Sequence, residues 1–104
     1  MIKETLKGYL MDIACIRTNP VAEMGSRAKN HTKTCALMGH CVESGYGLVN
    51  TQGEVVLLDD EATPKIVAVL QQINAEDEIW LQVDRQEKKG KMNTIKVEEA
   101  KAPV

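Results

Sequence analysis

The sequence predicts a small, mainly β domain, a five-stranded OB-like barrel with two helices, over residues 1–104 as a single unit. Three observations predict this fold. The length of 104 residues is typical of one compact domain. Five stretches show the composition and alternation of strands, and the clearest helical pattern falls between the third and the fourth. An α+β sheet with helices on one face is the alternative, because strand order cannot be read from one sequence.

The first element is expected to be a long strand followed by a loop. Residues Glu4–Ile16 interleave polar and apolar side chains and then become apolar on both faces, as a strand does when it enters a core. Gly8 is the natural place for a bend or a bulge in that strand. Residues Arg17–Asn30 are polar and contain Asn-Pro and Gly-Ser breakers, which indicates a loop.

A helix is expected next, over residues His31–Ser44. Asn30 or Thr32 can cap its start, because both side chains accept hydrogen bonds from the free N–H groups of a first helical turn. Gly45 stands where a residue of left-handed conformation would end the helix.

A hairpin and the second helix follow. The apolar stretches Tyr46–Asn50 and Glu54–Asp60 flank a short connection that contains Gly53, which predicts a hairpin. In the stretch ATPKIVAVLQQIN, Thr63 is the candidate N-cap and Pro64 the first helical residue. Its apolar residues recur at the i, i+3, i+4, i+7 spacing of one helical face, and they are Ile66, Val69, Leu70 and Ile73.

Two strands are expected to close the fold. In the stretch DEIWLQVDRQ, apolar and polar residues alternate, which places Ile79, Leu81 and Val83 on one face and Trp80 on the other. The stretch MNTIKVEEA supplies the last strand, with Ile95 and Val97 facing the core.

Composition excludes several classes of protein. The net charge of −2 gives no long-range attraction to a phosphate backbone, so nucleic acid is not an expected partner. The longest apolar runs are far shorter than the ~20 residues that a membrane-spanning helix needs. We expect a periplasmic or secreted location if a leader was removed, and a cytoplasmic location otherwise. The partner would be a protein or a small ligand of unknown identity.

The stretch HTKTCALMGHCVESGYG holds two of the three cysteines and both histidines. If it forms one helix, His31, Cys35, Met38 and Cys41 share a broad face and His40 points away from them. Cys15 would complete a set whose ligand types suit zinc. The predicted metal ligands are therefore Cys15, His31, Cys35, Met38 and Cys41. Met38 shifts the preference of this set towards copper(I).

Two other interpretations of these cysteines stay open. An intact helix would separate Cys35 from Cys41 by at least about 9 Å, which is too far for a disulfide. A bridge from Cys15 to either of them would staple the first strand to the helix in an oxidising compartment. Alternatively, Cys35, Met38 and Val42 form an ordinary apolar stripe with no chemical role.

The chain also resembles a family of small, mostly uncharacterised and commonly exported bacterial domains. The residues that carry the resemblance are GYLMDIAC, His31, CALMGHC and the SGYG that begins at Ser44. The resemblance implies an OB-like domain and gives weight to Asp12, Cys15, His31, Cys35, Met38 and Cys41 as one unit. It implies no particular reaction.

Three hypotheses for the function result. The first is a non-enzymatic bacterial envelope domain whose Cys/His/Met patch is a disulfide staple or binds zinc or copper. The second is a module that binds a peptide, a glycan or a small ligand on the barrel face around Trp80 and Tyr46. The third is a thiol redox protein with Cys35 or Cys41 as the reactive thiol.

Overall fold

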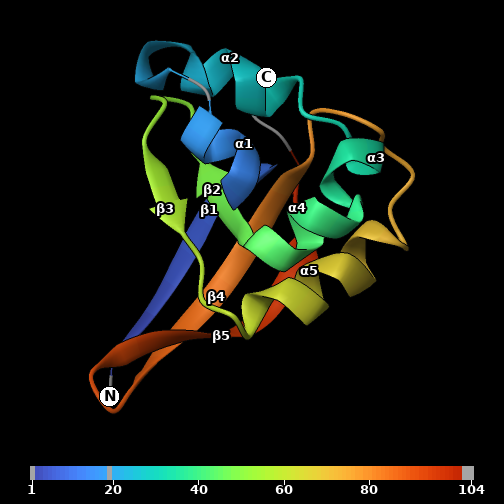
Figure 1. Ribbon diagram of the computed structural model, residues 1–104. Helices are drawn as coiled ribbons and strands as arrows, with labels where there is room; N and C mark the ends of the chain where they lie inside the picture. The colour runs from blue at the N-terminus through green and yellow to red at the C-terminus, as the bar shows by residue number, and fades with distance from the viewer. Residues whose placement is uncertain (1, 19, 102–104) are drawn as a thin grey trace.

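The computed structural model describes residues 2–18 and 20–101, which form one five-stranded antiparallel sheet with short helices packed against it (Figure 1). The sheet has the order β3-β2-β1-β4-β5. The strands are β1 (Lys3–Asp12), β2 (Tyr46–Val49), β3 (Val55–Leu57), β4 (Trp80–Lys88) and β5 (Lys91–Glu99). The helices are α1 (Ile13–Thr18), the 3-10 turn η1 (Val21–Glu23), α2 (Met24–Lys29), α3 (Lys33–Ala36), α4 (Gly39–Ser44) and α5 (Ala62–Leu70).

The predicted five strands are present, but the predicted closed barrel is wrong. Within the described residues β3 and β5 are the two edges of the sheet, and they do not pair with each other. One side chain links them instead. The carboxylate of Asp59, just after β3, accepts hydrogen bonds from the N–H and the hydroxyl of Thr94 in β5, at 3.0 and 2.6 Å. Since β3 has only three residues before the chain turns into α5, it is too short to close the barrel.

The alternative prediction, an α+β sheet, describes the structure, but the helices cover both faces of the sheet rather than one. Successive side chains of a strand point to opposite faces, and the two core clusters follow this rule along β1. Leu10 packs with Ile66 and Leu70 of α5, whereas Tyr9 and Met11 pack with α2. The structure is therefore an α+β sheet between two helical layers.

The two clearest sequence patterns are confirmed. The helix α5 buries Ile66 and Leu70 completely, although it begins at Ala62 rather than at Pro64. In β4, Leu81 and Val83 face the α5 side of the sheet and Trp80 faces the other. The hairpin of β2 and β3 is present as well.

The prediction that Ile95 of β5 faces the core is wrong. Asp84 pairs with Lys96 and Arg85 pairs with Thr94, so Ile95 is the extra residue of a β-bulge. Its side chain is 48% exposed rather than facing the core, and Thr94 is buried beside it.

The first half of the chain departs most from the prediction. The first strand ends at Asp12 instead of Ile16, so Cys15 lies in α1. Residues Arg17–Asn30, expected to be a loop, contribute to α1, η1 and α2, because Met24 and Ala28 bury an apolar face against the sheet. Gly8 makes no bulge. It pairs with Leu81 in unbroken register, and a Cβ atom there would lie 2.9 Å from a carbonyl oxygen of β2.

The single helix expected over His31–Ser44 is two helices, α3 and α4, with a break at Leu37 and Met38. In a continuous helix the carbonyl oxygen of Ala36 would accept from the N–H four residues later. Here that oxygen accepts the hydroxyl hydrogen of Tyr46 at 2.6 Å. A tertiary hydrogen bond thus takes the place of a helical one.

Candidate metal centre

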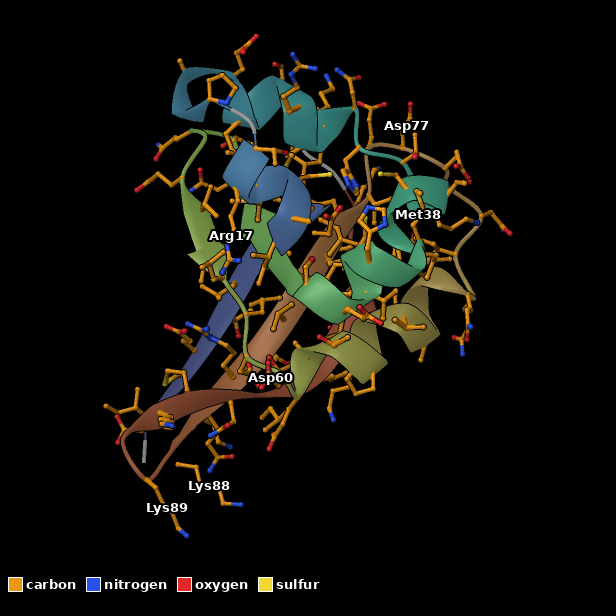
Figure 2. The ribbon with its side chains drawn as sticks, in the orientation of Figure 1. Arg17, Met38, Asp60, Asp77, Lys88 and Lys89 are labelled. Atoms are coloured by element: carbon orange, nitrogen blue, oxygen red, sulfur yellow. The ribbon has the colours of Figure 1, made fainter. Side chains whose placement is uncertain are left out.

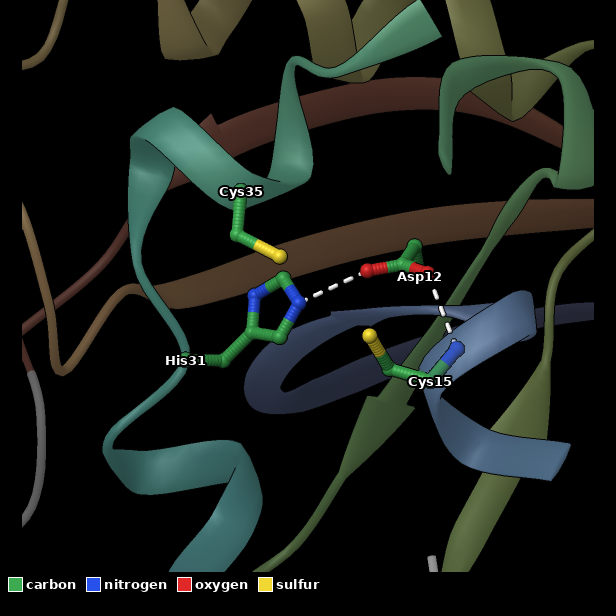
Figure 3. A group of neighbouring side chains, drawn as sticks. All are labelled: Asp12, Cys15, His31 and Cys35. Carbon is green, nitrogen blue, oxygen red and sulfur yellow. Dashed lines mark hydrogen bonds and ion pairs between the residues drawn. The ribbon is translucent and has the colours of Figure 1, made fainter. Parts of the chain in front are cut away.

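Four side chains from two stretches of the sequence converge at one end of the sheet (Figure 3). Asp12 ends β1, Cys15 lies in α1, His31 lies between α2 and α3, and Cys35 lies in α3. One ligand atom from each lies within 4.8 Å of all the others. Figure 3 shows the Nε2 edge of His31 pointing towards Asp12, with the two sulfur atoms on either side of that pair.

Asp12 is positioned by the junction of β1 with α1. Its Oδ2 accepts the N–H of Cys15 at 2.9 Å, which is the bond that an N-cap side chain makes to the third residue of its helix. The start of α1 is also tied to the end of α4, since the N–H of Ile13 donates to the carbonyl of Gly45 at 2.9 Å. Asp12 is fully buried as a result.

The helix α3 places Cys35 in the same way. Thr32, one of the two residues predicted to cap this helix, is the N-cap of α3. The Oγ1 of Thr32 accepts the N–H of Cys35 at 3.1 Å. Both Cys15 and Cys35 are therefore third residues of capped helices. The spacings Asp-x-x-Cys and Thr-x-x-Cys therefore indicate where a helix begins. The cap hydrogen bond in each case also fixes the backbone of the cysteine.

A short hydrogen bond joins His31 to Asp12. The Nε2 of His31 lies 2.7 Å from the Oδ1 of Asp12, and both side chains are buried. The other ring nitrogen, Nδ1, is buried and has no hydrogen-bond partner within the described part of the protein. Because an ionised carboxylate only accepts hydrogen bonds, Nε2 is the nitrogen that donates to Asp12.

The electrostatics of the cluster follow from this bonding. Burial by itself raises the pKa of Asp12, but hydrogen bonds from His31 and from the N–H and thiol of Cys15 outweigh it and hold the pKa well below its usual range. Burial raises the pKa of the Cys15 thiol to about 12, and the hydrogen bond to Asp12 adds to this effect. At neutral pH the metal-free cluster therefore contains a buried carboxylate beside a protonated Cys15 thiol.

The other predicted ligands lie in different positions. Cys41 is fully buried in α4, and burial raises its pKa to about 12, with Asp12 and Cys35 as neighbours that contribute to this rise. It is next to the group of four without belonging to it. Met38, labelled in Figure 2, is 47% exposed at the break between α3 and α4. His40 is exposed, as expected.

The break in the helix also removes the argument against a Cys35–Cys41 bridge. That argument required a continuous helix, which the structure does not have. None of the three cysteines, all of which lie in the described part of the chain, is in a disulfide.

The surface expected around Trp80 and Tyr46 is not available. Tyr46 is fully buried, and Trp80 is buried against Tyr9 with their rings edge to face at a centroid distance of 4.8 Å. These rings belong to the two core layers and offer no open face to a ligand.

Asp12 is the member of the cluster that the metal-ligand prediction left out, although the resemblance named it. Its signal in the sequence is its position three residues before a cysteine, where a strand gives way to a helix.

Comparisons with protein-family models, with curated proteins and with solved structures found no match to this chain. None of the helices in residues 2–18 and 20–101 has the length and the apolar character that crossing a membrane requires.

The arrangement has a clear chemical capacity. One nitrogen, one carboxylate oxygen and two sulfurs are brought together in a largely buried place, and this donor set could hold a metal ion.

Proposed function

We propose that this chain is a zinc-binding domain and that Asp12, Cys15, His31 and Cys35 are the four ligands. The single observation that carries the proposal is the convergence of their ligand atoms to within 4.8 Å of one another. Two stretches of sequence, residues 12–15 and 31–35, supply these atoms, so a bound ion would tie the junction of β1 and α1 to α3.

The distances in the cluster suit a small tetrahedral ion after a modest contraction. Zinc binds sulfur at about 2.3 Å and nitrogen or oxygen at about 2.0–2.2 Å, so tetrahedral ligand atoms lie roughly 3.3–3.8 Å apart. The sulfur atoms need to move inwards, while the pair of His31 and Asp12 needs to open from 2.7 Å. The ion would thus replace the proton that these two side chains share.

The choice of zinc rests on the ligand types. Copper(I) prefers sulfur ligands, and a copper site would gain from the thioether of Met38. That side chain is 47% exposed and outside the group of four. Zinc, by contrast, accepts thiolate, imidazole and carboxylate ligands in one tetrahedral site.

The proposed role of the ion is structural, and the domain is proposed to be non-enzymatic. Four protein ligands complete a tetrahedron and leave no position for a substrate or a reactive water. The exported location that the resemblance implies stays a prediction.

Binding is expected to depend on pH because the ligands must lose protons. Zinc takes thiolates, and the Cys15 thiol holds its proton with a pKa raised to about 12 by burial and by Asp12. Affinity should therefore fall as the pH is lowered. Proton release on binding, followed by calorimetry in buffers of different ionisation enthalpy, would measure this coupling.

The test is metal analysis of reduced protein that was purified without chelator. We expect one zinc ion per chain, and we expect Cys35→Ser and His31→Gln to lose it. Met38→Leu and His40→Gln are matched controls in the same segment, and both should keep the ion. Absence of bound zinc after titration with micromolar zinc, or full retention in Cys35→Ser, would contradict the proposal.

A further inference from the structure

Two half-buried thiols face each other across the cluster. Cys15 and Cys35 lie on different helices, and their sulfur atoms are at most 4.8 Å apart. Neither is in a disulfide, and both retain some exposure to solvent. Figure 3 shows the two sulfur atoms directed into the same space between α1 and α3.

We propose that Cys15 and Cys35 also form a reversible disulfide, so that oxidation by a small-molecule disulfide closes this bridge and expels the metal. The release of metal rests on the proposed function, whereas the formation of the bridge does not. The site would then have two exclusive states, one with an ion between the sulfurs and one with a covalent bond.

The geometry allows this bond with little movement. A disulfide has a sulfur–sulfur distance of about 2.05 Å, so the two atoms must approach by less than about 3 Å. A change of this size is on the scale of side-chain rotation. The helices that carry the two thiols are short, with six residues in α1 and four in α3.

Cys41 is the competing partner, and burial separates it from the other two. Its side chain is fully buried, whereas Cys15 and Cys35 are partly exposed. Thiol–disulfide exchange begins with attack on an incoming disulfide, so the first thiol must be reachable from solvent. The mixed disulfide therefore forms on Cys15 or Cys35, and the other of these two exposed thiols closes the bridge. Cys41, whose side chain is a neighbour of Cys35, is the competitor that the variants below test.

The reaction balances in atoms and electrons. One cysteine thiolate attacks a sulfur of the oxidant RSSR, forms a mixed disulfide and releases one RS⁻. The other thiolate attacks the protein sulfur of that mixed disulfide, closes the bridge and releases the second RS⁻. The two cysteines lose two electrons, RSSR gains them, and each RS⁻ takes up a proton. The zinc ion leaves unchanged in charge, because both of its sulfur ligands are consumed.

The experiment uses the full chain, reduced and loaded with one equivalent of zinc, and then treated with oxidised glutathione. Released zinc is followed with a chromogenic chelator, and free thiols are counted in denaturant. We expect free thiols to fall from three to one per chain as zinc is released. Digestion after Lys and Arg should link the peptide of Cys15 to the peptide that holds both Cys35 and Cys41.

Variants identify the bridge. Cys41→Ala should form the bridge and release zinc as the wild type does, and Cys15→Ser should form no bridge within the chain. A dominant Cys35–Cys41 or Cys15–Cys41 bridge, a bridge only between two chains, or three thiols that survive oxidation would each overturn the inference. If the reduced chain binds no zinc but still forms the Cys15–Cys35 bridge, the proposed function fails and the bridge stands.

Discussion

Replacing Asp12 with Asn tests the bonding at the centre of the cluster in the metal-free protein. The carboxylate accepts hydrogen bonds from His31 at 2.7 Å and from the N–H of Cys15 at 2.9 Å, and it is fully buried. Asn keeps one oxygen for Cys15 but turns an N–H group towards the Nε2 proton of His31. Two donors then face each other, and the alternative ring nitrogen of His31 has no partner in the described protein.

The expected cost follows from these contacts. A hydrogen bond to a charged group contributes about 1.5–3 kcal/mol, and Asn avoids part of the cost of burying a carboxylate. We therefore expect Asp12→Asn to lower the free energy of unfolding by about 2 kcal/mol at pH 7. For a domain of this size that loss corresponds to a fall in melting temperature of roughly 8–16 °C. Urea unfolding with a chelator present measures the loss, and Asp60→Asn, at an exposed position, is the control.

The pH dependence gives a second readout of the same change. Although burial raises the pKa of Asp12, its hydrogen bonds hold the folded-state pKa below the value of about 3.9 in an unfolded chain. The stabilisation is then fully present above about pH 4 and is lost as the pH falls through the folded-state pKa. The gap between wild type and variant should stay constant from pH 5 to 8 and shrink below pH 4. Equal stability at pH 7, or a gap that persists unchanged to pH 2, would refute this bonding.

Four further changes probe the elements that position the cluster. Tyr46→Phe removes the hydroxyl that donates to the last carbonyl of α3 at 2.6 Å and should cost about 1 kcal/mol in urea unfolding. Thr32→Ala removes the cap of α3 and should cost about 1 kcal/mol, with weaker zinc affinity because Cys35 loses its anchor. Gly47→Ala would place a Cβ atom 2.8 Å from a side chain of α1 and should cost about 1–3 kcal/mol. Gly39→Ala, with open space around it, should stabilise α4 by about 0.5–1 kcal/mol, and a loss there would contradict the helical assignment.

Sequence reasoning succeeded where a pattern is local. The i, i+3, i+4, i+7 spacing of α5 and the alternation in β4 depend only on which face of an element is buried, and both are confirmed. It failed where a distant contact decides the backbone. At the break between α3 and α4, Met38 is extended, and the hydroxyl of Tyr46, ten residues along the chain, donates to the carbonyl of Ala36.

The barrel prediction failed for a related reason. The order of the elements does not show that β3 has only three residues. Instead of backbone hydrogen bonds between β3 and β5, the side chain of Asp59 accepts a hydrogen bond from Thr94. The bulge at Ile95 is likewise invisible in the alternating pattern of β5.

The sequence predicted that cysteine and histidine side chains form the site. It did not predict correctly which residues belong to it. Cys15, His31 and Cys35 stand out as soft ligands, and the fold brings them together. The angle argument that added Met38 and Cys41 assumed one straight helix, which does not exist. Asp12 replaces them in the group because its side chain ends a strand and caps a helix at the same point.

X-ray absorption spectroscopy at the zinc edge, on the reduced chain loaded with one equivalent of zinc, identifies the atoms bound to the ion. The proposal predicts two sulfur atoms at about 2.3 Å and two nitrogen or oxygen atoms at about 2.0–2.2 Å around the ion. Three sulfur atoms would place Cys41 in the site instead of Asp12, and a set of nitrogen and oxygen atoms alone would contradict a site built on Cys15 and Cys35.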